Sequence, residues 1–137
     1  MESFARRSFF VGTWGSAARM KLAVNLVLGL NRAALAEGLA FARAAGLDPV
    51  VALDVLRAGA AYSGVMDTKG AKMVGGDFAP QARLSQHLKD VHLILAEAGR
   101  TGATVPLSEL HRALLDRLVT AGFGDDDNAA IIRAFEQ

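Results

Sequence analysis

A lysine and an asparagine, Lys21 and Asn25, stand four residues apart inside a long apolar segment. On a helix this spacing is about one turn, so both side chains point to the same side. A positioned lysine can act as a general acid or base, and an asparagine can hydrogen-bond a substrate oxygen. From the spacing alone, the simpler interpretation is that Lys21 reaches solvent and Asn25 bonds a neighbouring segment.

Lys89 and Asp90 form a second pair of candidate residues. Lys89 is displaced by one position from the apolar stripe that includes Leu88 and Val91, which places it at the border of the expected buried face. Its amine could reach a phosphate, a carboxylate or a carbonyl, whereas Asp90 could pair with a lysine or cap another helix. The periodicity itself favours two solvated charges.

Metal-binding and phosphate-binding signatures are absent from the sequence. His87 and His92 are five residues apart, which does not place them on one helix face, and no H-E-x-x-H sequence occurs. These two histidines and His111 are therefore expected at the surface or its boundary, and no metal ligands are assigned. No G-x-G-x-x-G or G-x-x-x-x-G-K-[ST] sequence is present to cradle a phosphate.

The composition limits the class of protein. The chain has 137 residues, which fits one domain, and 52% of them are hydrophobic, too many for a disordered chain. A formal net charge of +1 gives no reason to expect nucleic acid or a charged membrane surface as a partner. The absence of cysteine excludes disulfides and is compatible with a cytoplasmic location.

The most apolar run, residues 22–42, is nearly long enough to span a bilayer. It contains four residues that are costly in hydrocarbon, namely Asn25, Asn31, Arg32 and Glu37. We therefore expect a helix buried in protein and no membrane partner. The first residues, MESFARRSFF, lack the apolar core and cleavage site of a signal peptide.

Glycine and proline stops divide the chain into about six helices and predict an all-α fold with one long N-terminal helix. The expected helices cover about 15–45, 49–59, 63–74, 83–100, 106–121 and 129–137. The first begins with Ser16 as its N-cap, and its apolar perimeter suits a helix that is central to the domain or shared with a partner. Only the SFFVG segment near the start could form a short strand.

Four longer segments carry a family resemblance: VGTWGSAARMKLAVN, EGLAFARAAGLDPVVALDVL, GDFAPQARLSQHLKDVHLILAEAGRTGATVPL and GFGDDDNAAIIRAFEQ. In this order they resemble the C-terminal domain of the β-hydroxyacid dehydrogenases, the group of 3-hydroxyisobutyrate dehydrogenase and glyoxylate/succinic semialdehyde reductase. The first segment is similar to the family pattern G-x-x-G-x-G-x-x-x-K-x-x-N-N, and the third contains a matching K-D pair. The resemblance implies that residues 1–137 form one all-α domain like the C-terminal domain of 6-phosphogluconate dehydrogenase.

The resemblance also implies roles for the candidate residues. Lys21 matches the family's catalytic lysine, the general acid/base when hydride moves between carbinol and nicotinamide. Asn25 matches the substrate-orienting asparagine, and Lys89 matches the lysine that approaches the cofactor and the substrate. Asp90 matches a paired aspartate with a structural role. The chain departs from the family pattern at Ala17, Val24, Ala82 and Arg83, which bears on the substrate more than on the fold.

A nucleotide-binding Rossmann domain precedes this domain in the family and has no counterpart within residues 1–137. The resemblance therefore implies NAD or NADP bound mainly by that partner domain, a small hydroxy acid or semialdehyde as substrate, and no turnover by these residues alone. It also implies a homodimer through the long first helix.

Two alternatives to this interpretation stay open. One is a free-standing helical dimerisation or interaction module that descends from such an enzyme and has no catalytic activity. The other is an unrelated helical ligand-binding domain, in which Lys21 and Lys89 lie far apart.

Overall fold

The computed structural model describes residue 12 and residues 14–136, and over these residues the chain is built from helices. Their order is α1 (Trp14–Ala44), α2 (Pro49–Ala58), α3 (Val65–Gly75), α4 (Leu84–Thr101), α5 (Pro106–Thr120) and the 3-10 helix η2 (Asn128–Phe135). An isolated β-bridge joins Arg83 to Asp127. The predicted all-α class with one long N-terminal helix is confirmed.

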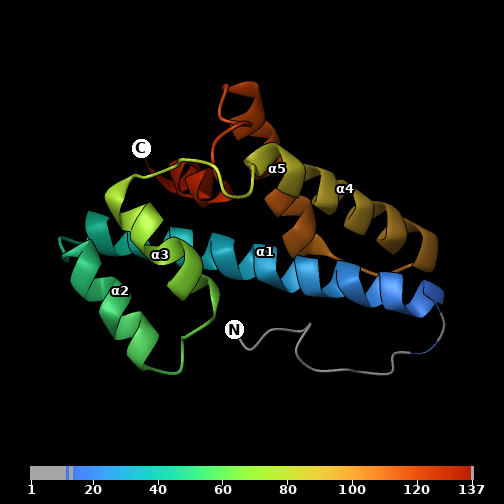
Figure 1. The fold of residues 1–137 in the computed structure, drawn as a ribbon, viewed down its shortest axis with the longest axis horizontal. Helices are drawn as coiled ribbons and strands as arrows, with labels where there is room; N and C mark the ends of the chain where they lie inside the picture. Colours follow the sequence, from blue (N-terminus) through green and yellow to red (C-terminus); the bar gives the residue numbers. More distant parts are fainter. Residues whose placement is uncertain (1–11, 13, 137) are drawn as a thin grey trace.

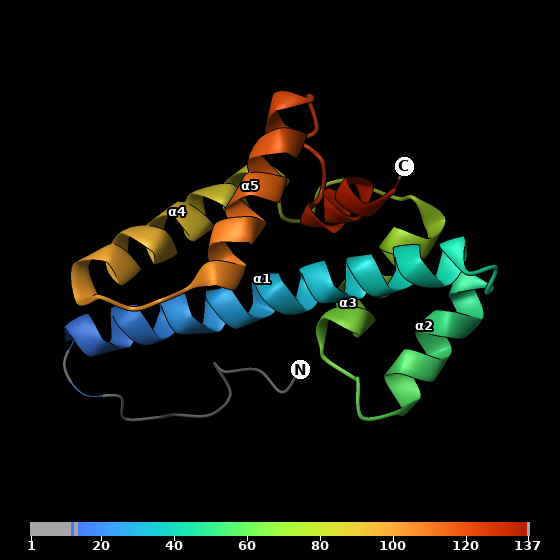
Figure 2. The same ribbon diagram turned by 180° about the vertical axis from the view of Figure 1, so that it is seen from behind.

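Helix α1 runs through the whole domain and contacts each of the other helices (Figures 1 and 2). Its 31 residues span about 45 Å. Helices α2 and α3 pack along its C-terminal half, and α4 lies over its N-terminal half (Figure 1). By length and composition α1 could also cross a membrane. In this fold, one side of α1 packs against the core residues of the other helices.

The core forms where α1, α3, α4, α5 and η2 meet. Its largest fully buried apolar side chains are Leu39, Met73, Leu84, Leu115, Ile131, Ile132 and Val91. They come from five different elements, so the hydrophobic burial that stabilises the fold also fixes α4 against α1. This contact positions the candidate residues.

Most helix ends agree closely with the predicted ones. Asp48 caps α2 as expected, because its Oδ1 accepts a hydrogen bond of 2.8 Å from the backbone N–H of Val50. The expectation for Ser16 is wrong: α1 begins earlier, at Trp14, and Ser16 lies inside it, where its Oγ accepts a hydrogen bond from Arg19. Residues 8–11 of the SFFVG segment lie outside the described residues.

The buried carboxylate of Asp127, which is 0% exposed, holds the segment before α4 in place through hydrogen bonds. This carboxylate accepts hydrogen bonds at 2.9–3.2 Å from the backbone N–H groups of Gln81, Ala82 and Ala129. It also forms an ion pair with Lys69 Nζ at 2.9 Å. Burial opposes ionisation, but the hydrogen bonds outweigh it and lower the pKa of Asp127 to about 2.

Candidate functional site

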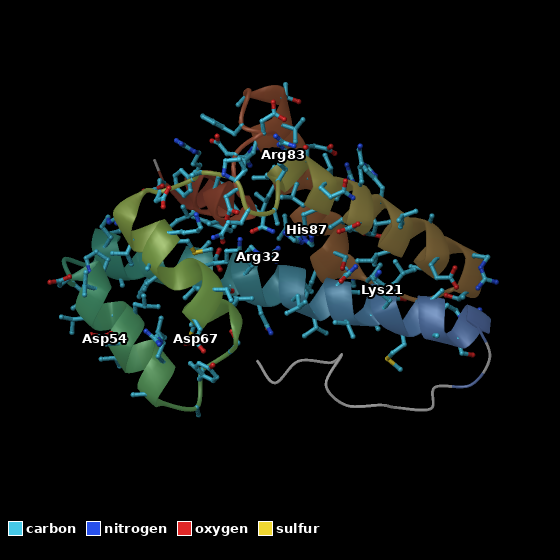
Figure 3. The ribbon with its side chains drawn as sticks, viewed as in Figure 1. Lys21, Arg32, Asp54, Asp67, Arg83 and His87 are labelled. Carbon is cyan, nitrogen blue, oxygen red and sulfur yellow. The ribbon has the colours of Figure 1, made fainter. Side chains whose placement is uncertain are left out.

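Lys21 and Asn25 lie one turn apart on α1, as predicted. The Lys21 side chain is exposed, whereas that of Asn25 is half-buried. Within the described residues Lys21 forms no hydrogen bond and no ion pair, so its ammonium group is available to a bound molecule. Figure 3 shows Lys21 on the N-terminal half of α1, below α4.

Lys89 is exposed on α4, one turn after Gln86. The spacing of three residues places Lys89 and Gln86 on the same face of α4. Within the part of the chain that the structure describes, Lys89 also has no ion-pair partner. Like Lys21, it offers a free ammonium group.

A hollow of about 120 Å³ lies between α1 and the first turns of α4. It is lined by Asn25, Leu28, Arg32, Ala82, Arg83, Gln86, His87, Asp90 and Asn128. The structure therefore brings Asn25 and Asp90 to one site, together with residues of η2 and of the segment before α4.

Along their helices, the two lysines lie on the same side of this hollow. Lys21 is one turn before Asn25 on α1, and Lys89 is one turn after Gln86 on α4. Because α1 and α4 run in opposite directions (Figures 1 and 2), both steps lead towards the N-terminal end of α1. Neither lysine lines the hollow itself. Within the described residues both ammonium groups are unpaired, and an ammonium group in such a position can protonate an oxygen atom of a small molecule.

Two histidines support the hollow from inside the fold. The expectation that they lie at the surface or its boundary is wrong: His87 is 7% exposed and His111 is 4% exposed. Their rings are 5.2 Å apart and pack against α1 at Gly29. A Cβ at Gly29 would lie 2.3 Å from His87 Nε2, so only glycine leaves room for the imidazole.

Burial keeps both imidazoles neutral. It lowers the pKa of His87 to about 3, and the nearby positive charge of Arg32 acts in the same direction. Burial and the charge of Arg32 lower the pKa of His111 to about 4. Asp90 Oδ2 lies 4.0 Å from His87 Nδ1, so the aspartate of the K-D pair faces the inside of the domain.

Sequence reasoning missed the inner members of this site. Arg32 appeared only as a polar residue in an apolar run, yet it lines the hollow beside His87 (Figure 3). The available signal was the spacing of Asn25, Gly29 and Arg32, which places a small residue between two polar ones on one face of α1. Nothing local in the sequence indicates that the ring of His87 occupies the space at Gly29.

Residues 15–135 match the family described as "NAD-binding of NADP-dependent 3-hydroxyisobutyrate dehydrogenase". The chain is 33% identical over 129 residues to glyoxylate/succinic semialdehyde reductase 1 of Arabidopsis thaliana, covering 94% of this chain and 45% of that protein. It is 32% identical over 130 residues to the cytokine-like nuclear factor N-PAC of Aedes aegypti, covering 95% of this chain and 23% of that protein. The chain thus spans less than half the length of these curated relatives.

Solved structures of 3-hydroxyisobutyrate dehydrogenases contain the same fold. The enzyme of Salmonella typhimurium superposes with a TM-score of 0.85 at 28% identity, over 88% of this chain and 42% of that one. The enzyme of Mycobacterium tuberculosis superposes with a TM-score of 0.84 over 94% of this chain and 46% of that one. At 24% identity, the second likeness bears on the fold alone.

Proposed function

Because the chain belongs to the NAD-binding family of NADP-dependent 3-hydroxyisobutyrate dehydrogenases, we propose that it forms the lysine-bearing half of a dehydrogenase active site. The enzyme would move hydride between NAD(P) and a small hydroxy acid or semialdehyde, since the Arabidopsis relative is a glyoxylate/succinic semialdehyde reductase. The arrangement of Lys21 and Asn25 carries this proposal. Asn25 lines the hollow between α1 and α4, and Lys21, which has no partner among the described residues, lies one turn away on the same side of α1.

Lys21 is the proposed general acid/base. When hydride adds to a carbonyl carbon, the carbonyl oxygen gains negative charge and takes a proton from Lys21 Nζ. In the reverse direction Lys21 accepts the proton of the hydroxyl group. Asn25 orients the substrate by a hydrogen bond from its amide, and its half-buried position limits the directions in which that amide can point.

The residues present fit a nicotinamide dinucleotide in part. Lys89 is exposed and unpaired within the described residues, so it can donate to an oxygen of the cofactor or the substrate. When bound, the cofactor supplies or accepts the hydride. We assign most of its binding to a Rossmann domain of the full-length enzyme, in agreement with the 45% of the Arabidopsis relative that this chain spans.

The simplest test of this assignment of the cofactor to another domain is to measure turnover by the 137 residues alone. NADH or NADPH oxidation is measured with glyoxylate and with succinic semialdehyde, and we expect no oxidation above the rate without protein. Fusion of the part of the Arabidopsis relative that this chain does not cover to the N-terminus is expected to produce activity. Turnover by the unfused chain would contradict the proposal that half of the site lies on another domain.

A stripe along α1 supports a homodimer. Met20, Val27, Ala34 and Phe41 follow one another at intervals of seven residues, and all four are exposed. The spacing places them along one side of the helix over about six turns. Val27 is 54% exposed and Phe41 is 73% exposed, which is unfavourable for large apolar side chains on a lone domain. A second copy of α1 covers such a stripe.

The N-PAC relatives favour a second candidate function. N-PAC is a cytokine-like nuclear factor in which the matched region makes up 23% of the chain. A helical interaction module without catalysis would use the apolar stripe of α1 and leave Lys21 without a role. It predicts that the fused protein described above binds its partner copy but does not oxidise NADPH.

A further inference from the structure

One wall of the hollow between α1 and α4 is built from two segments that are far apart in the sequence. Ala82 and Arg83 come just before α4, whereas Asn128 begins η2. Backbone hydrogen bonds join the two segments: the N–H of Asn128 donates to the carbonyl of Ala82 at 2.8 Å, and the N–H of Leu84 donates to the carbonyl of Asp126 at 2.9 Å. The wall therefore keeps its shape as long as the two segments stay paired.

The carboxylate of Asp127 lies between these two segments and bonds to both. Its Oδ1 accepts hydrogen bonds from the backbone N–H groups of Gln81 and Ala82 at 3.0 and 3.2 Å. Its Oδ2 accepts one from the backbone N–H of Ala129 at 2.9 Å. One oxygen thus holds the segment before α4 and the other holds the first turn of η2. Hydrogen bonds to a charged acceptor are stronger than those to a neutral one.

Lys69 supplies the counter-charge of this carboxylate from a third element, α3. Its Nζ lies 3.0 Å from Oδ1 and 2.9 Å from Oδ2 of Asp127, and both side chains are buried. Arg32 on α1 also acts on Asp127 through its charge, but within the described residues the two form no ion pair. Lys69 does not line the hollow, so its amine is not placed to exchange a proton with a molecule bound there.

Loss of the Lys69 ammonium group changes what the carboxylate can hold. A carboxylate that is buried without its counter-charge takes up a proton more readily. The protonated oxygen becomes a donor and accepts less well, and the bonds to the remaining oxygen are no longer bonds to a charged group. The segment before α4 and the first turn of η2 are then held less firmly, and the wall of the hollow is free to shift.

We propose that Lys69 is a positioning residue, which acts through Asp127 to hold this wall of the hollow in place. Asn25 lines the same hollow from α1, so the distance between Asn25 and the wall sets how closely a bound molecule can be held. The consequence for catalysis rests on the proposed function. Lys69 contributes to substrate affinity and not to the proton transfer assigned to Lys21.

The first test uses the 137-residue chain and needs no substrate. Amide hydrogen exchange is measured by NMR for the N–H groups of Gln81 and Ala82, relative to that of the core residue Leu39 on α1. In Lys69→Met the two amides are expected to exchange at least about tenfold faster relative to Leu39 than in the wild type, because they lose a charged acceptor.

Two further variants separate the charge from general loosening of the fold. Leu53→Ala removes a buried side chain that lies against Gly70 on α3 and is expected to leave the relative exchange of the two amides unchanged. In Lys69→Met/Asp127→Asn, the asparagine oxygen is neutral and can take the place of Oδ1. This double variant is expected to restore slow exchange at the two amides but not at Ala129, because the side-chain NH₂ group cannot accept.

The second test uses the fused protein described above, with glyoxylate as substrate. Lys69→Met is expected to raise KM about tenfold and to leave kcat within about twofold of the wild type, since the wall positions the substrate and Lys21 is unchanged. Leu53→Ala is expected to change neither constant. A fall in kcat at unchanged KM would overturn the proposal.

The exchange experiment also has an outcome that overturns the proposal. If Lys69→Met speeds exchange at Gln81 and Ala82 no more than at Leu39, then Lys69 stabilises the fold as a whole and does not position the wall. A fused wild-type protein without any turnover would contradict the proposed function instead, and the exchange rates then decide the positioning role of Lys69 by themselves.

Discussion

Lys69 and Asp127, which are 58 positions apart, form a buried ion pair in which Nζ contacts both carboxylate oxygens at 2.9–3.0 Å. The pair joins α3 to the start of η2, and the same carboxylate holds the backbone of Gln81 and Ala82 just before α4. The helix that carries Lys89 and Asp90 is therefore positioned by a residue from the C-terminal end of the chain.

Breaking this pair from one side is expected to be costly. Asp127→Asn leaves the ammonium group of Lys69 buried without a counter-charge, which should lower the free energy of unfolding by about 3–5 kcal/mol. Urea denaturation measures the change. The double variant Lys69→Met/Asp127→Asn should recover part of the loss.

The control is Glu136→Gln, which breaks the exposed pair with Arg43 and should cost at most about 1 kcal/mol. Equal losses of stability for Asp127→Asn and Glu136→Gln would contradict this role of Asp127.

Stability is expected to fall with pH through the buried histidines. The pKa of His87 is about 3 and that of His111 about 4 in the folded state, against an ordinary value of 6.5. Below pH 6.5 the unfolded chain therefore binds protons that the folded chain does not, and stability decreases until the folded-state pKa values are reached. Each histidine contributes a slope of up to about 1.4 kcal/mol per pH unit.

The free energy of unfolding, measured by urea titration between pH 7.5 and 4.5, checks this dependence. His111→Asn removes one of the two titrating groups and should make the curve less steep. His92→Gln, at an exposed position, should leave the slope unchanged. A wild-type stability that is flat over this range would show that the buried imidazoles do not titrate as described.

The close approach of His87 to Gly29 gives a steric prediction. Gly29→Ala places a methyl group 2.3 Å from His87 Nε2 and 3.1 Å from His111 Cε1, and should destabilise the fold by about 1–3 kcal/mol. Gly99→Ala on α4 meets no atom within 4 Å and should stabilise the fold by about 0.5–1 kcal/mol through the better helix propensity of alanine. The two changes should thus shift the unfolding midpoint in opposite directions.

The stripe on α1 predicts the oligomeric state. Phe41→Glu introduces a charge at the C-terminal end of the proposed contact between two copies of α1 and should convert the dimer to a monomer at micromolar concentration. Sedimentation velocity measures this shift. Val55→Glu, on the exposed side of α2 where Val55 is 66% exposed, is the matched control and should remain dimeric. A monomeric wild-type chain would argue against the stripe as a contact.

Local patterns were sufficient to predict the helical fold. Glycine or proline lies at or near most helix ends, and Asp48 caps α2 by a contact with a residue two positions away. The family resemblance was confirmed, because it rests on motifs that are continuous in the sequence. The one local error, Ser16 as a cap, arose because α1 continues one turn further towards the N-terminus than the first polar residue suggests.

The inner part of the site depends on contacts that no local pattern records. The burial of His87 and His111 follows from the missing side chain at Gly29, on a different helix. The Lys69–Asp127 pair joins residues 58 positions apart, and each residue alone resembles an ordinary surface charge. The proposed roles of Lys21, Asn25 and Lys89 stay predictions that rest on the family resemblance and on the place of Asn25 in the hollow between α1 and α4.

The most direct test of the central claim is the rate of NADPH oxidation by the fused protein, with glyoxylate as substrate, before and after Lys21→Met. Methionine keeps the length and apolar stem of lysine but cannot transfer a proton. We predict that kcat falls by about 10²–10⁴ while the unfolding midpoint stays unchanged. A folded fusion that binds NADPH and oxidises it equally fast with methionine at position 21, or that does not oxidise it at all, would contradict the account.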